Sequence, residues 1–160
     1  MFVHGNSLYR PLIHVPLIMS MPSRLPQGEI VHAPLNLRDL AATVLDLTGT
    51  PATGEFEGRT LRRLWDSTLA APAEPLLFEV ITTGKPSGKV EELRSVVWGT
   101  TEYIRHEDGQ EELYDLARDE AEEHDLTDTP AAGSRLAEMR SAMDSILVAT
   151  GEDRWPRDSE

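Results

Sequence analysis

The stretch HGNSLYRPLIHVPLIM, residues 4–19, is the part of this chain around which the rest is organised. A polar turn that contains glycine leads into an amphipathic turn and then into an apolar run at 15–19. An apolar run bounded by polar residues predicts a buried strand. In α/β proteins, polar side chains at the mouth of such a strand often bind ligands. Because Gly5 allows close backbone approach, His4 is the candidate binding residue, and a surface histidine without a role is the alternative.

The composition describes a globular protein with an excess of acidic residues. Its 160 residues are enough for one domain, or for one subdomain with the edge of another, and 39% of them are hydrophobic. The net charge of −13 comes from 28 acidic and 15 basic residues, which argues against nucleic acid and against an anionic membrane as partners. The chain has no cysteine, so disulfides, thiolate nucleophiles and cysteine-bound zinc are excluded.

No segment predicts a membrane span or a signal peptide. No run approaches the roughly 20 apolar residues that a membrane-spanning helix needs. The N-terminus also lacks the basic and then apolar layout of a secretory signal. A chain that began at Met1 would therefore stay in the cytoplasm by default, although the sequence leaves the compartment open.

The first half of the chain predicts one long helix among loops. The predicted elements are a loop over 21–28, an edge strand at Ile30 and Val31, a helix over 37–48 and a short helix over 60–66. Asn36 is the predicted cap of the long helix, and Gly49 is its predicted end. The small, proline-containing stretch 70–75 is the predicted boundary between two subdomains.

The second half predicts a small antiparallel sheet and a helix. The predicted strands are 76–82, 93–99, 102–106 and 112–116. Asp108 and Gly109 lie between the last two strands and predict a tight hairpin, because both residue types tolerate a positive φ. Apolar residues at helical spacing predict a helix over 134–150, ended by Gly151. We expect this helix to cover the apolar face of the sheet.

Neither the histidines nor the acidic residues predict a metal site. The five histidines show no spacing that would bring two rings to one ion. The acid-rich stretch 107–125 lacks the register of a calcium-binding loop and is interpreted as a solvated face.

The string SMPSR at 20–24 matches S-x-P-S-R, the signature in which sulfatases convert a cysteine or serine into a formylglycine nucleophile. Such a nucleophile needs a helix N-terminus, whose dipole and free N–H groups stabilise developing negative charge. The residues that follow, LPQG at 25–28, cannot continue as a helix. We therefore interpret this match as a coincidence.

Several blocks of the chain resemble the C-terminal part of sulfatases of the alkaline-phosphatase superfamily. Residues 4–19 resemble the segment that leads from the last active-site residue into a core strand. Further blocks in matching order are GEIV at 28–31 with AP at 33–34, LRDL to LDLTG at 37–49, GRTL at 58–61, the strand pair at 94–104, and ELYDL at 112–116 continuing to Asp119, Glu122 and Leu126. The resemblance covers nearly the whole chain, and even MFV at 1–3 resembles residues that precede the histidine in longer relatives.

A few positions depart from the family pattern. Arg10 and Pro11 stand where the family usually has acidic residues after the tyrosine. Ala42 replaces a helix proline, and Glu120 and Asp125 replace the proline and asparagine of the final motif. These departures affect local geometry more than the resemblance itself.

The resemblance implies sulfate-ester hydrolysis, for which this chain would provide only a few of the residues. Sulfatases hydrolyse sulfate esters with a hydrated formylglycine held on a calcium ion, helped by lysine and histidine residues. The nucleophile and the calcium ligands lie in the large N-terminal domain of the family. Among the site residues only His4 has a counterpart here, and its role would be to bind the sulfate oxygens or the leaving group. No cofactor is expected in this chain.

The resulting prediction is an α/β chain, α+β as it stands. Residues 1–70 would be the last strand and helices of a sulfatase α/β domain, and residues 71–160 a four-stranded antiparallel sheet packed by a C-terminal helix. The predicted function is that of a C-terminal sulfatase fragment, inactive alone and bound to a sulfate ester only within a full-length parent. Two alternatives stay open: a non-catalytic interaction module that self-associates through an exposed strand edge, and action on phosphate or phosphonate esters.

Overall fold

The computed structural model describes residues 7–51, 58–66, 69, 73–82, 91–130 and 132–151. Contacts divide the chain into a sheet unit, Met1–Val15 with Pro75–Glu160, and an α2 unit, Pro16–Glu74. Each unit is described by itself. The predicted domain division at residue 70 stays a prediction, and the contact units differ from it by grouping residues 7–15 with the sheet.

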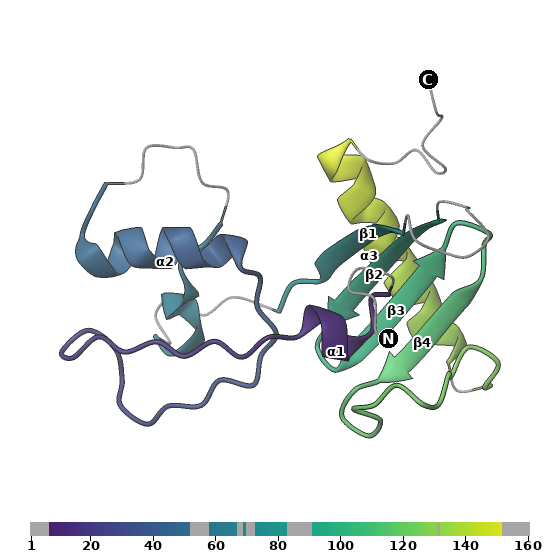
Figure 1. Cartoon of the computed structure of the whole chain (residues 1–160), viewed down its shortest axis with the longest axis horizontal. Helices are drawn as coiled ribbons and strands as arrows, with labels where there is room; N and C mark the ends of the chain where they lie inside the picture. The colour runs from purple at the N-terminus through teal and green to yellow at the C-terminus, as the bar shows by residue number, and fades with distance from the viewer. Residues whose placement is uncertain are drawn as a thin grey trace. The chain divides into compact units, whose positions relative to one another are not determined.

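The sheet unit contains four antiparallel strands in the order β1-β2-β3-β4 (Figure 1). The strands are β1 (Leu76–Thr82), β2 (Glu91–Trp98), β3 (Thr101–His106) and β4 (Glu111–Asp115). Each predicted strand is confirmed to within two residues at its ends. The predicted hairpin is also confirmed, with Gly109 at φ 87° and its N–H bound to the carbonyl of His106 at 3.0 Å. The Asp108 side chain stabilises the hairpin in another way, because it accepts a hydrogen bond from Gln110 N.

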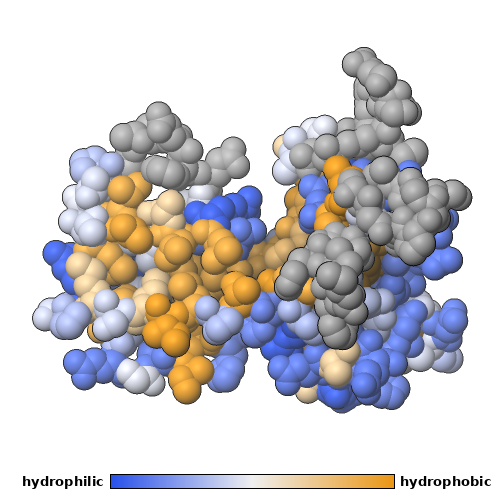
Figure 2. Space-filling view, viewed as in Figure 1, coloured by the Kyte–Doolittle hydropathy of each residue, from blue (hydrophilic) through white to orange (hydrophobic). Residues whose placement is uncertain are grey.

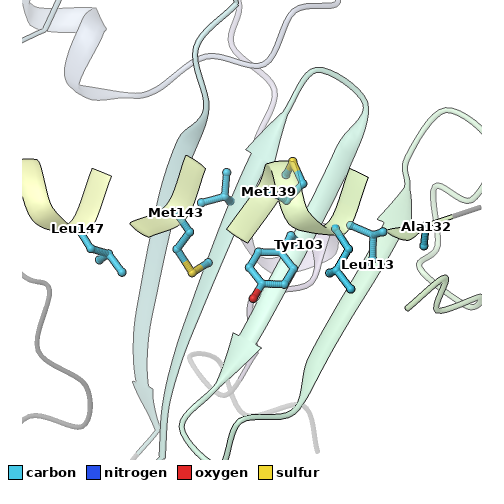
Figure 3. Close-up of a cluster of buried hydrophobic side chains, with 8 residues drawn as sticks. Tyr103, Leu113, Ala132, Met139, Met143 and Leu147 are labelled. Carbon is cyan, nitrogen blue, oxygen red and sulfur yellow. The ribbon is translucent and has the colours of Figure 1, made fainter. Parts of the chain in front are cut away.

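One face of this sheet packs against the predicted C-terminal helix, α3 (Gly133–Thr150), which ends at Gly151. Alternate strand residues point to this face, and helix residues spaced three or four apart meet them (Figure 3). The buried cluster consists of Val96, Tyr103, Leu113, Ala132, Leu136, Met139, Met143 and Leu147. This cluster confirms the expected packing of the helix across the sheet.

The opposite face of the sheet is covered by residues 7–13, which include α1 (Arg10–Ile13) (Figure 1). Leu8 is buried beneath this turn, but no residue of α1 itself is buried. This face carries both apolar and polar strand residues: Leu93, Val97 and Ile104 are buried on it. Hydrogen bonds to Glu112 and Glu122 add to the contacts that hold the segment.

The α2 unit is built on α2 (Arg38–Thr48) and the short 3₁₀ helix η1 (Leu61–Leu64), as predicted for these stretches. The Asn36 side chain accepts a hydrogen bond from Arg38 N at 3.0 Å, and Gly49 ends α2 in the left-handed region. In the part of the chain that the structure describes, no helix is both long and apolar enough to span a membrane.

The packed face of α2 is more polar than its apolar pattern suggests. Its buried residues are Asp39, Thr43 and Leu47, while Leu37 and Val44 are exposed. Asp39 accepts from Arg59 N at 3.0 Å and from the Arg63 guanidinium at 2.7 Å. Thr43 accepts from Leu61 N at 2.8 Å. This polar face joins α2 to residues 58–63 and leaves apolar side chains in solvent.

Two predicted strands are wrong. Residues 15–19 form no strand, and Ile18 is 91% exposed. Ile30 and Val31 also form no strand. An extended segment becomes a strand only when a neighbour satisfies its N–H and C=O groups, and no described segment pairs with either stretch.

Candidate functional site

The predicted site residue His4 lies outside the described residues, which begin at Ser7. The site is therefore built from the residues that follow it. We call residues 7–13 the anchored segment, because one side chain from β4 and one from the turn after β4 fix it in two places. The anchored segment and the sheet face beneath it form the candidate functional site.

The first anchor is the phenol of Tyr9. Its hydroxyl donates a hydrogen bond to Glu112 Oε2 at 2.8 Å. Its ring meets the ring of Tyr114 edge-on, with 6.2 Å between the ring centroids. Edge-to-face rings at this distance attract one another beyond simple burial. Tyr9 is thus bound to β4 by both its polar and its apolar parts.

Glu112 is the centre of this anchor. Its Oε1 contacts His106 Nε2 at 2.5 Å, and its Oε2 also accepts from the hydroxyl of Tyr114 at 2.5 Å. Burial opposes ionisation of Glu112, but the hydrogen bonds from His106, Tyr114 and Tyr9 outweigh it and lower its pKa to about 2. A carboxylate that stays ionised is a strong hydrogen-bond acceptor, so the anchor persists across the neutral pH range.

The same contacts shift the pKa values of the donors. Burial and the bond to Glu112 raise the pKa of Tyr9 to about 12 and also raise that of Tyr114. The hydrogen bond to Glu112 raises the pKa of His106, although burial opposes that shift. The cluster therefore favours an ionised Glu112 beside a protonated His106 and two neutral phenols.

The second anchor is the carboxylate of Glu122. Its Oε2 accepts a hydrogen bond from the backbone N–H of Arg10 at 2.7 Å. Glu122 lies next to Glu102 of β3, which is fully buried and accepts from the hydroxyl of Ser95 at 2.7 Å. Burial raises the pKa of Glu102 to about 8, and Glu122 adds to the rise, while Ser95 and Arg10 oppose it.

The acid-rich stretch 107–125 is thus not simply a solvated face, and that interpretation is wrong in part. Glu112 and Glu122 hold the anchored segment. Asp119 accepts from the N–H groups of Glu123 and His124, and Asp125 accepts from Leu113 N at 3.0 Å. These carboxylates order the turn after β4, because each satisfies backbone donors that the turn leaves without partners.

The formylglycine-like string at 20–24 does not lie at a helix N-terminus. Residues 21–25 form a turn, in which Leu25 N donates to Met21 O at 3.0 Å, and no helix follows. This agrees with the sequence argument. Among the residues that the structure describes, no three histidine or carboxylate side chains come together to bind a metal.

A shallow hollow of about 370 Å³ lies next to this turn in the α2 unit. It is lined by Ser23, Arg24, Asp46, Leu47, Arg62, Trp65 and Asp66. Arg62 is bound to Asp46 at 3.4 Å and to Asp66 at 3.2 Å, so acidic partners already balance its charge. The hollow therefore does not concentrate positive charge as an anion site does.

Sequence analysis identified His4 but missed the residues that hold the segment after it. The missed residues are Tyr9, Glu102, His106, Glu112, Tyr114 and Glu122. For the four strand residues the signal is the period of two along β3 and β4, which places Glu102 and His106 on the same face as Glu112 and Tyr114. Tyr9 and Glu122 lie outside the strands. Only the pairing of the strands reveals that these residues meet.

Comparisons with known proteins place the chain among sulfatases. Residues 2–148 match the family model described as N-sulphoglucosamine sulphohydrolase, C-terminal. Arylsulfatase K of Danio rerio is 32% identical over 122 residues, which are 72% of this chain and 23% of that protein. A sulfatase of Formosa agariphila is 29% identical over 116 residues, which are 71% of this chain and 20% of that protein. The chain thus spans about a quarter of the length of these relatives.

Solved structures show the same fold. A 2-O GAG sulfatase superposes with a TM-score of 0.60 at 24% identity, over 72% of this chain and 25% of that one. A second structure, solved with D-glucosamine-2-N,6-O-disulfate as its substrate, gives a TM-score of 0.60 at 16% identity, over 76% and 25% of the two chains. At these identities the likeness establishes the fold alone.

The family match, together with the four-stranded antiparallel sheet crossed on one face by α3, makes this chain a C-terminal domain of the sulfatase type. More narrowly, the chain belongs to the N-sulphoglucosamine sulphohydrolase C-terminal family.

Proposed function

We propose that this chain is the C-terminal portion of a sulfuric ester hydrolase, and that the sheet unit is the scaffold for one wall of its sulfate-ester site. The family match and the 32% identity to an arylsulfatase support this function. The observation that carries it is the double anchor, in which Glu112 binds Tyr9 and Glu122 binds Arg10. An anchor five residues after His4 limits the positions that His4 can reach, as a substrate-binding residue requires.

Within such a site, His4 would bind the sulfate oxygens or the oxygen of the leaving group. The formylglycine nucleophile and the calcium ion would be provided by other parts of a longer enzyme. The described residues do not fit a calcium site, because no cluster of three carboxylate or imidazole ligands occurs among them. We therefore assign no calcium ligand and derive no step through the metal.

The 160-residue chain alone is expected to hydrolyse no sulfate ester. Catalysis of this kind needs several groups held together around a metal, and one histidine provides little of that preorganisation. Incubating the purified chain with an aryl sulfate should release no more phenol than buffer does, and an aryl phosphate assayed in parallel tests the alternative ester. Turnover that Ser20→Ala abolished would contradict the proposal, because it would make the string at 20–24 a working nucleophile.

The coding DNA upstream of Met1 provides the positive test. The proposal predicts an in-frame extension that carries C/S-x-P-x-R and a pair of metal-binding aspartates. An in-frame stop codon immediately upstream would contradict a role in catalysis and would favour the second candidate below.

That second candidate is a non-catalytic interaction module. The exposed apolar surface of the α2 unit favours it: Ile18, Ile30, Leu37 and Val44 are each at least half exposed. Apolar side chains gather over this unit in Figure 2. An apolar surface of this kind marks a site for a protein partner, either the rest of a sulfatase or a second copy of this chain. A dimeric mass by size exclusion with light scattering would favour self-association, and a monomeric mass would argue against it.

A further inference from the structure

Two neighbouring glutamates beneath the anchored segment each have one buried carboxylate oxygen with no donor among the residues that the structure describes. Glu102 is fully buried and Glu122 is 8% exposed. One oxygen of each is satisfied, since Glu102 Oε1 accepts from Ser95 and Glu122 Oε2 accepts from Arg10 N. The other two, Glu102 Oε2 and Glu122 Oε1, are buried and accept no hydrogen bond within the described residues.

Two ionised carboxylates could not remain side by side in this position. Each would be stripped of water, and the two like charges would repel one another. A divalent cation would relieve the repulsion, but calcium takes six or more oxygen ligands, and no third carboxylate joins the pair among the described residues. A single proton is sufficient, because it converts one carboxyl into a donor for the other.

We propose that Glu102 and Glu122 share one proton, and that this proton acts as a latch that holds the anchored segment on the sheet. The link to the segment is direct, because the second oxygen of Glu122 accepts from the backbone N–H of Arg10. Glu122 is thus a positioning residue: it fixes the chain five to six residues after His4 and does not itself touch substrate. The latch involves described residues only, so it does not depend on the sulfatase function proposed above.

The other polar and charged groups around Glu102 and Glu122 do not donate to the two unsatisfied oxygens, so they do not take the place of the shared proton. From β2, Ser95 already donates to Glu102. From β4, Tyr114 lies opposite Glu102 in the strand register, but its hydroxyl donates to Glu112. From α1, the Arg10 guanidinium is bound at 3.3 Å to the exposed Glu120. The helix α3 covers the other face of the sheet and provides no charge here.

The direction of the pH effect follows from the pKa of Glu102. Burial and the neighbouring Glu122 raise that pKa from 4.5 to about 8, so the folded chain retains a proton that the unfolded chain has lost. The stabilisation is therefore complete below about pH 4.5 and is lost as the pH rises through about 8. Above that pH both carboxylates ionise and repel, and we expect Glu122 to swing away and release Arg10.

Glu102→Gln tests the latch, because the amide keeps the size of the side chain and donates permanently to Glu122. Melting temperatures of the full chain are measured between about pH 6 and about pH 9, together with the hydrogen-exchange protection factor of the Arg10 amide. We expect the Arg10 protection factor of the wild type to fall at least about tenfold over this range, and that of the variant less than about threefold. The melting temperature of the variant should fall by at least about 4 °C less than that of the wild type.

Glu138→Gln is the matched control, because it removes the same charge from a residue at the surface of α3. It should keep the pH dependence of the wild type. If Glu102→Gln fails to fold, Glu122→Gln provides the same test with the donor and acceptor exchanged. Equal pH dependence in the wild type and the foldable variant would overturn the latch. So would a rise in the wild-type melting temperature on addition of calcium or magnesium chloride that the variant lacks, since the pair would then hold a cation.

Discussion

Glu112→Ala is expected to lower the free energy of unfolding by about 3 kcal/mol or more and to free the anchored segment. The substitution removes the acceptor shared by Tyr9, His106 and Tyr114. Hydrogen bonds to a charged group contribute about 1.5–3 kcal/mol each, and donors left without a partner in a partly buried place add a further loss. Urea denaturation followed by circular dichroism measures the change, and faster exchange of the Arg10 amide, which donates to Glu122, reports release of the segment.

Glu123→Ala is the control for this variant. It removes one carboxylate from the same acid-rich stretch, but the Glu123 side chain is exposed. Its effect should stay within about 0.5 kcal/mol. An equal loss in the two variants would show that net charge, and not the hydrogen bonds of Glu112, stabilises this face of the sheet.

Gly58→Ala is expected to destabilise the α2 unit by about 3 kcal/mol or more. A Cβ at this position would lie 2.1 Å from Arg38 O and 2.9 Å from the Cα of Asp39. Both are backbone atoms, so the strain cannot be relieved by a side-chain rotation. The chain at 58–61 would have to move away from α2, and the hydrogen bond from Leu61 N to Thr43 would be lost with it. Thermal denaturation of the purified variant checks this expectation.

Gly133→Ala is the matched control for Gly58→Ala. A Cβ at Gly133 would meet nothing within 4 Å, and this glycine does not adopt a positive φ. Gly133 is the first residue of α3, so alanine should leave stability unchanged or increase it by up to about 1 kcal/mol. If the two variants were equally destabilised, the close contact at Gly58 would not be the cause.

Local sequence pattern predicted most of the fold. Strands β1 to β4 are short runs between turn residues, and the helix α3 carries apolar residues three or four positions apart. Gly109, Gly49 and Gly151 occur where a turn or a helix end needs the left-handed region. These features depend on interactions within a few residues. The sequence therefore predicts them without knowledge of the partners.

Residues 15–19 show where local pattern fails. Their apolar run satisfies the rule for a buried strand, yet Val15 and Ile18 are exposed because no described strand pairs with them. The apolar pattern also fails to predict which residues of the helix α2 are buried. Its buried face includes Asp39 and Thr43, whose partners at 59–63 are distant in sequence, so an apolar pattern could not reveal them.

The candidate site was predicted only in part, for the same reason. Glycine and polar neighbours made His4 a candidate, but nothing near it in sequence indicates how the segment at 7–13 is held. Tyr9 and Glu112 are separated by 103 residues. Their contact depends on the register of β3 with β4 and on the path of the segment that crosses them. A single sequence contains no local signal for such a contact.

The most direct measurement of the central claim, that polar side chains of the sheet hold the anchored segment, is a double-mutant cycle of Tyr9→Phe and Glu112→Gln. Tyr9→Phe removes only the hydroxyl that donates to Glu112 at 2.8 Å, and Glu112→Gln keeps the size of its side chain. The free energies of unfolding of the four proteins should show a coupling of about 1.5 kcal/mol or more. Additive effects, within about 0.5 kcal/mol, would contradict the claim that this bond holds the segment on the sheet.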